Sequence, residues 1–175
     1  WGNVLAQRAA HIGLLGKEVE GFSGQGAQGY ASLHSNYIAI NGNKISGKVR
    51  SSVDMLKNLD NIAKGGNGFM FTVGNGNKAA TYVHEVGHIM HQRVFLSRGV
   101  KDYDEMIRKT EEEVKNLKLR GVSIYGNSGG SSNVLEFVAE MYTAYIFHGP
   151  ALKKAMPKEY EWIEGFAKEA YGYEG

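Results

Sequence analysis

The sequence predicts an α+β fold that is mainly helical and carries a small sheet. Two long segments, 78–97 and 131–147, repeat apolar residues at the three- and four-residue spacing of a helix. Two shorter segments are rich in β-branched and aromatic residues instead. They are Ser35–Ile45, which contains an Asn-Gly pair typical of a hairpin turn, and Gly68–Val73. Because helices outnumber strands in this inventory, we expect the α+β class.

Capping residues and glycines indicate where these elements end. Ser51 or Ser52 can cap a helix that ends before Gly65. The 24 glycines cluster in three stretches that we expect to be loops. One of these loops is expected over Phe22–Tyr30. In chain order, the helices are expected over 3–19, 51–63, 78–97, 104–119, 131–147 and 157–171.

Length and composition predict a single domain over residues 1–175. The absence of cysteine excludes disulfides, thiolate metal ligands and cysteine nucleophiles. A net charge of +2 gives no strong attraction to nucleic acid, and no apolar run of about eighteen residues is present to span a membrane. Because the chain begins at Trp1 without methionine, we expect it to be part of a longer polypeptide.

The segment 81–91 contains the motif His84-Glu85-Val86-Gly87-His88. Residues four apart lie one above the other on a helix, so His84 and His88 point the same way and can bind one zinc ion. Glu85 is turned by about a hundred degrees from His84, because a helix has about 3.6 residues per turn. Its carboxylate therefore stands beside the ion, where a general base for a water molecule is needed.

A third ligand is required, and several residues compete for this role. His91 lies on the same helix face, but seven residues separate it from His84, about 10.5 Å along a helix at 1.5 Å per residue. One ion cannot bind both, so we expect His91 to pack or to support a ligand. Asp102 and Asp104 follow the zinc helix closely and remain weaker alternatives.

The stronger candidates are Glu136 and Glu140, which lie one turn apart in an otherwise apolar helix. Two stacked carboxylates repel each other, and burying them is unfavourable unless a cation compensates their charge. A zinc ion bound by two histidines supplies that cation. We expect one of the two glutamates to bind the metal and the other to accept a hydrogen bond from a ligand imidazole.

The run Gly68–Val73 precedes the zinc helix and is expected to be a strand at a sheet edge. An exposed edge strand next to a zinc site can hold an extended peptide by backbone hydrogen bonds. Phe69 and Phe71 in this run are therefore the predicted substrate-binding residues.

Four motifs in the second half of the chain carry a resemblance to a known family. They are His84-Glu-Val-Gly-His88, Tyr125-Gly126, Glu136-Phe-Val-Ala-Glu140 and Pro157-Lys-Glu-Tyr160. In these motifs the chain resembles the catalytic domain of anthrax lethal factor and its relatives, which are zinc metalloendopeptidases of the gluzincin type. The resemblance covers about residues 82–166.

The resemblance implies a zincin-like fold with a role for each matching residue. The implied zinc ligands are His84, His88 and Glu136. Glu85 would be the general base, Glu140 would support a ligand imidazole, and Tyr125 would donate a hydrogen bond to the developing oxyanion. The spacer between Tyr125 and Glu136 is longer here than in that family. Tyr142 and Tyr145 are therefore alternatives for the role of Tyr125.

The implied function is hydrolysis of polypeptides by a zinc-activated water with Glu85 as base. The competing hypothesis is a zinc-containing binding or structural domain of a larger assembly, such as a phage particle or a toxin, with a vestigial protease site. A third is a protease that cleaves its own parent chain. The sequence leaves the substrate preference and the compartment open.

Overall fold

The computed structural model describes residues 29–32, 37–40, 51–66, 68–69, 78–127 and 133–172. In this part of the chain no helix is long and apolar enough to cross a membrane. The elements, in chain order, are β1 (Gly29–Ser32), β2 (Tyr37–Ile40), α2 (Ser52–Ala63), α3 (Lys78–Ser97), α4 (Tyr103–Asn116), α5 (Ile124–Asn127), α6 (Asn133–Ala155) and α7 (Pro157–Tyr171).

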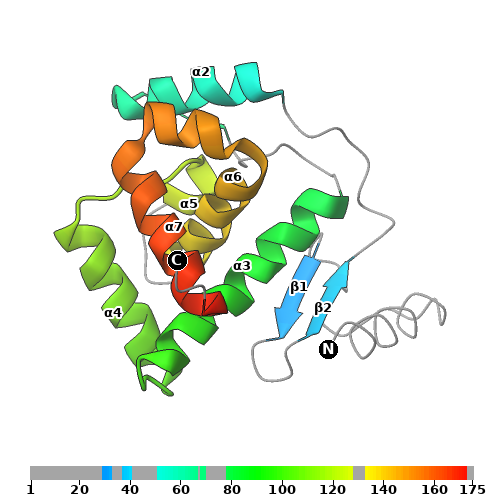
Figure 1. Ribbon diagram of the computed structural model, residues 1–175, viewed down its shortest axis with the longest axis vertical. Helices are drawn as coiled ribbons and strands as arrows, with labels where there is room; N and C mark the ends of the chain where they lie inside the picture. The colour runs from blue at the N-terminus through cyan, green and yellow to red at the C-terminus, as the bar shows by residue number, and fades with distance from the viewer. Residues whose placement is uncertain are drawn as a thin grey trace.

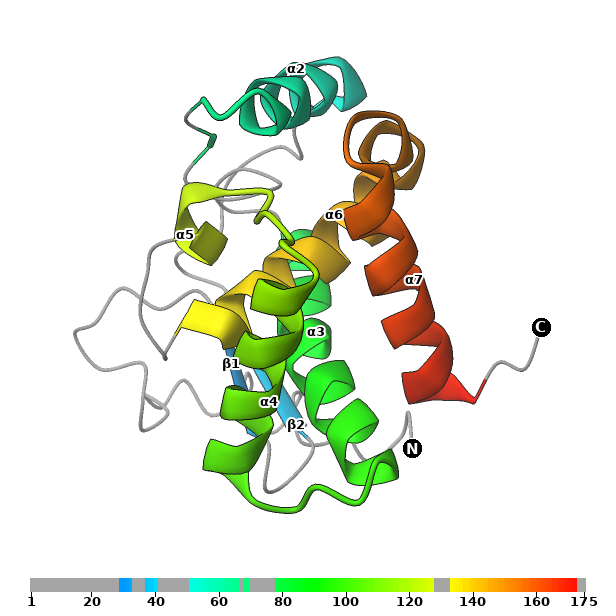
Figure 2. The same ribbon diagram turned by 90° about the vertical axis from the view of Figure 1, so that its left-hand side faces the viewer.

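Helix α6 lies at the centre of the fold, and the other helices pack around it (Figures 1 and 2). Its inward residues recur at helical spacing and are almost fully buried. They are Val134, Phe137, Val138, Met141 and Ala144. The regular part of α6 ends at Phe147, as the sequence predicts, because His148 leaves helical geometry with φ −138° and ψ 28°. Pro150 follows within the kinked continuation, where it cannot donate a backbone hydrogen bond.

Helix α3 approaches α6 closely at Gly87. A Cβ atom built on Gly87 would lie 2.8 Å from the Cα atom of Ala139, so no larger residue fits without moving one backbone. Gly87 is the fourth residue of the His-Glu-x-Gly-His motif, and Ala139 directly precedes Glu140. The two helices therefore touch at the segments that contain the candidate ligands, His84 and His88 on α3 and the two glutamates on α6.

Several predicted helix ends are confirmed. Ser51 is the N-cap of α2, where its Oγ accepts a hydrogen bond of 3.1 Å from the backbone N–H of Asp54. Helices α3 and α7 have the predicted bounds. Helix α7 ends at Tyr171 and is followed by Gly172, whose φ of 66° suits a glycine cap.

The expected α+β class is wrong, because the described residues form a mainly helical fold. Strands β1 and β2 have four residues each and pair antiparallel only with each other, from Gly29–Ile40 to Ser32–Tyr37. They lie beside α3 (Figure 1), and among the described residues neither strand contributes to the main hydrophobic core. Two such short strands make a hairpin and not a layer of the fold.

The hairpin also differs from the predicted one in its partner strand. β2 lies within the predicted segment 35–45, but it pairs with β1, which begins in the expected loop 22–30. Gly68 and Phe69 belong to no strand. The predicted Asn41-Gly42 turn, the helix over 3–19 and the rest of the 68–73 run lie outside the described residues.

Candidate metal centre

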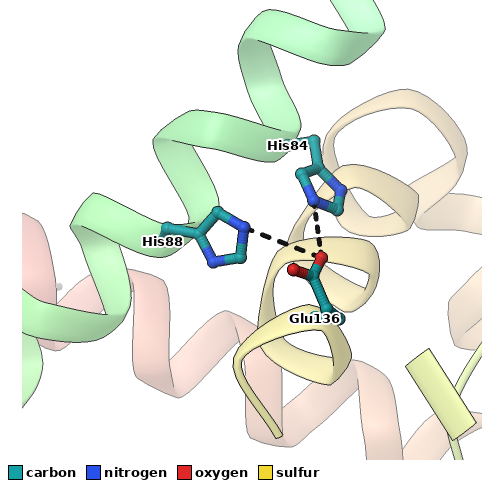
Figure 3. Close-up of side chains that lie close together, drawn as sticks. All are labelled: His84, His88 and Glu136. Carbon is teal, nitrogen blue, oxygen red and sulfur yellow. Dashed lines mark hydrogen bonds and ion pairs between the residues drawn. The ribbon is translucent and has the colours of Figure 1, made fainter. Parts of the chain in front are cut away.

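Three potential metal ligands meet where α3 passes the first turn of α6. Figure 3 shows the imidazoles of His84 and His88 directed from α3 toward the carboxylate of Glu136 on α6. One ligand atom from each of the three residues can be chosen so that all lie within 4.8 Å of one another. Glu136 Oε2 lies 2.9 Å from Nε2 of His84 and 3.7 Å from Nε2 of His88.

This donor set suits a zinc ion. Zinc binds imidazole nitrogen and carboxylate oxygen at about 2.0–2.2 Å, which places tetrahedral ligand atoms about 3.3 Å apart. The two distances to Glu136 Oε2 lie on either side of this value, and the three ligand atoms all lie within 4.8 Å of one another. Three protein ligands leave a fourth position for water or substrate, as catalytic zinc sites do.

The second glutamate of α6 orients one of these imidazoles. Oε1 of Glu140 lies 2.9 Å from Nδ1 of His84, and the Glu140 side chain is almost fully buried. A carboxylate at Nδ1 holds that nitrogen protonated and directs Nε2 toward the metal position. Glu136 thus lies in the ligand cluster, and Glu140 lies behind the imidazole of His84.

The protonation of the two histidines differs. Burial alone would lower the pKa of His84, but hydrogen bonds to Glu136 and Glu140 and their charges raise it to about 10. Burial and the charge of His84 lower the pKa of His88 to about 4. His88 therefore keeps a free lone pair at neutral pH, whereas a metal ion must displace a proton from His84.

Glu85 lies beside the cluster and is 6% exposed. Burial raises the pKa of its carboxyl to about 7, with the charge of His84 opposing this rise and that of Glu136 adding to it. A carboxylate with a pKa near neutrality is suited to take up and release a proton. A nearby divalent cation would lower this pKa and favour the ionised base.

Tyr125 also reaches the cluster, from the short helix α5. Its ring centroid lies 6.4 Å from that of His84. Burial, the charges of Glu136 and Glu140, and a hydrogen bond with Glu136 raise the pKa of Tyr125 to about 12, so its hydroxyl stays a donor at neutral pH.

The two alternative tyrosines lie elsewhere on α6. Tyr142 is buried, and burial together with a hydrogen bond with Tyr171 raises its pKa. Tyr145 stacks on Tyr142 and packs on Tyr160. The structure therefore brings Tyr125 to the ligands, while Tyr142 and Tyr145 face α7.

The remaining predicted residues occupy other positions. His91 is fully buried and bonds through Nε2 to Oγ1 of Thr110 on α4, at 2.7 Å. Asp102 caps α4 by accepting a hydrogen bond from the backbone N–H of Glu105. Among the described residues, neither Asp102 nor Asp104 joins the ligand cluster.

The predicted substrate-binding pair is only half described. The backbone N–H of Phe69 donates to Oδ1 of Asn58 at 2.7 Å, and its carbonyl oxygen accepts from the N–H of Ile124 at 2.7 Å. Both backbone groups of Phe69 are therefore engaged within the protein and not offered to a peptide. Phe71 lies outside the described residues.

Sequence reasoning missed two residues that contact or support the site. Gly29 of β1 lies against Glu85, and a Cβ atom at Gly29 would collide with Oε1 of Glu85 and lie 2.7 Å from Cγ2 of Thr81. Asn58 is a buried amide on α2 that bonds to the segments around Phe69 and Val122. No local pattern marks Gly29, whereas a single polar residue on the apolar face of α2 could have drawn attention to Asn58.

Comparisons of the chain with protein-family models, with curated proteins and with solved structures found no match. The function of the chain is therefore inferred from the geometry of the cluster.

Proposed function

We propose that this chain is a zinc-dependent endopeptidase of the gluzincin type, with His84, His88 and Glu136 as the metal ligands. The observation that carries the proposal is the convergence of these three side chains beside the buried carboxylate of Glu85. A purely structural zinc site has no use for the carboxylate of Glu85, which is neither one of the three ligands nor the partner of a ligand imidazole. Structural zinc sites are also usually closed by four protein ligands.

Each of the other residues has a task in this reaction. A zinc ion bound to the three ligands would lower the pKa of a water molecule and polarise the peptide carbonyl. Glu85 would take a proton from the attacking water and deliver it to the leaving amine nitrogen. The hydroxyl of Tyr125 would donate a hydrogen bond to the oxyanion that forms on the carbonyl.

The test compares metal content and cleavage of a peptide library by the wild type and three variants. We expect about one zinc ion per chain in the wild type and in Glu85→Gln, with turnover in Glu85→Gln reduced by about 10²–10⁴ because the general base is lost. Glu136→Ala should lose both zinc and cleavage. The matched control is Glu161→Gln, which changes an exposed glutamate on α7 and should leave both unchanged.

The outcomes separate the competing hypotheses. Zinc retained in Glu136→Ala would remove Glu136 from the ligand set. A wild type that binds zinc but cleaves no peptide would favour a zinc-containing binding or structural domain. A wild type without zinc would overturn the proposal.

A further inference from the structure

Tyr125 belongs to a very short element whose position depends on its contacts with the rest of the fold. Helix α5 spans only Ile124–Asn127, a single turn, and isolated helices of this length are unstable in water. Two side chains, one at the end of the turn and one directly before it, fix its internal shape. Asn127 bonds to both backbone groups of Gly121 through its amide, and Oγ of Ser123 accepts from the N–H of Gly126. The place of the turn depends instead on contacts with other elements, and one of these is with α6, where Gly126 lies against Phe137.

Asn58 adds a second constraint, from α2. Its Nδ2 donates to the carbonyl oxygen of Val122 at 3.2 Å, and its Oδ1 accepts from the N–H of Phe69 at 2.7 Å. The two segments also bond directly to each other, because the N–H of Ile124 donates to the carbonyl oxygen of Phe69 at 2.7 Å. One amide thus joins α2 through two hydrogen bonds to the segment that enters α5 and to the neighbouring segment at Phe69, and a third bond joins these two segments to each other.

The burial of Asn58 shows that this amide serves a specific purpose. It is 5% exposed and lies on the same helix as the buried residues Met55, Leu59 and Ile62. A buried polar group is unfavourable unless it is hydrogen-bonded, and an apolar side chain here would leave the backbone groups of Phe69 and Val122 without this partner. Asparagine meets both needs, since its amide is at once donor and acceptor.

We infer that Asn58 is a positioning residue that holds Tyr125 beside the ligand cluster of His84, His88 and Glu136. This inference rests on the proposed function and assigns α2 a role in the reaction. Loss of the amide should let the turn move, which lowers turnover without loss of the metal, because none of the three ligands lies on α2 or α5.

The kinetic test measures kcat, KM and zinc content for Asn58→Ala, Tyr125→Phe and the double variant. Loss of an oxyanion donor reduces turnover by about 10²–10³, so we expect Tyr125→Phe to fall in this range and Asn58→Ala to lose at least about tenfold in kcat. KM and zinc content should stay near the wild-type values. In the Tyr125→Phe background, Asn58→Ala should have no further effect. An equal loss in both backgrounds would overturn the inference.

Two further variants control for stability. Met55→Ala removes buried volume from the same helix but no hydrogen bond, so it should destabilise the protein and leave kcat unchanged. Equal losses of kcat in Met55→Ala and Asn58→Ala would contradict a positioning role. If Asn58→Ala does not fold, Asn58→Asp takes its place, because a carboxylate keeps the acceptor for Phe69 and lacks the donor for Val122.

A structural measurement decides the inference even if the wild type cleaves no peptide. Crystal structures of the wild type and Asn58→Ala should differ in the bond between Ile124 and Phe69 and in the place of Tyr125, after superposition on α3 and α6. An unmoved turn would overturn the role of Asn58. An inactive wild type with a displaced turn in the variant would count against the peptidase alone.

Discussion

At the scale of single residues, the most specific feature of the site is the contact between Gly29 and Glu85. The backbone of β1 lies so close to α3 that only a glycine leaves room for the carboxylate of Glu85 and the methyl group of Thr81. The hairpin thereby helps to bury Glu85, and burial is the main cause of the pKa of about 7 of its carboxyl. The position of the predicted base therefore depends on a residue that is distant in sequence.

Gly29→Ala should displace the Glu85 carboxylate and lower kcat by about 10- to 100-fold, because small misplacements of a catalytic group are costly. Zinc content should not change, since Glu85 is not among the proposed ligands. Steady-state kinetics with elemental analysis would measure both.

The shorter side chain of Glu85→Asp leaves room for the new methyl group. In that background Gly29→Ala should have a much smaller effect, and an equally large effect would show that the methyl group acts on the hairpin and not on the base.

The residues that the sequence identifies are those whose role depends on local spacing. His84, Glu85 and His88 follow from the geometry of one helix, and Glu136 with Glu140 follows from the unfavourable charge of two carboxylates on an apolar helix. Gly29 and Asn58 have roles only through contacts across the fold. Their own sequence neighbourhoods contain no information about Glu85 or Tyr125.

At the scale of elements, the distance between α3 and α6 determines whether the three ligands can share an ion. Gly87 lies one residue before His88, and Ala139 lies three residues after Glu136. The contact between α3 and α6 therefore lies next to the ligand cluster. Because the opposing atoms belong to two backbones, they cannot rotate away as a side chain can.

Gly87→Ala should push α3 and α6 apart and weaken zinc binding by at least about tenfold, since ligand geometry governs affinity. Overpacking typically destabilises by about 1–3 kcal/mol, which should outweigh the gain of about 1 kcal/mol from replacing a helical glycine by alanine. Gly165→Ala on α7 is the matched control, because its Cβ atom meets nothing within 4 Å. It should keep wild-type zinc affinity and gain stability. Competition with a chelator and chemical denaturation measure the two effects.

Helices were more predictable than strands for a physical reason. The periodicity of α7 and its flanking residues specify Pro157–Tyr171 without reference to the rest of the fold. Strand pairing depends on a distant partner, so a local Asn-Gly pair could not reveal that β2 pairs with β1. β1 begins at the end of the glycine-rich stretch 21–29, whose composition predicts a loop, and its packing against α3 lets it form a strand there.

At the scale of the whole molecule, buried neutral histidines make the fold sensitive to acid. The hydroxyl of Thr110 donates to the carbonyl of Met106, so it accepts a hydrogen bond from Nε2–H of His91. Nδ1 of His91 has no hydrogen-bond partner among the described residues. Burial, with smaller effects from the charges of His88 and Arg98, lowers the pKa of His91 to about 3. Burial also lowers the pKa of His148 at the kink of α6.

Because the folded pKa of His91 is depressed, the unfolded chain binds more protons than the folded protein below the unfolded pKa of about 6.5. The contribution of His91 to stability is therefore complete above this pH and is lost as the pH falls toward about 3. Between pH 7.5 and 5.5 this loss amounts to about 1.4 kcal/mol.

His91→Gln keeps a donor for Thr110 and cannot titrate, so it should lose about 1.4 kcal/mol less than the wild type over this interval. Urea unfolding at the two pH values, with chelator present to remove metal linkage, measures the difference. Equal losses in the two proteins would mean that the pKa of His91 in the fold is close to its unfolded value, and the acid sensitivity would then have to arise at His88 or His148.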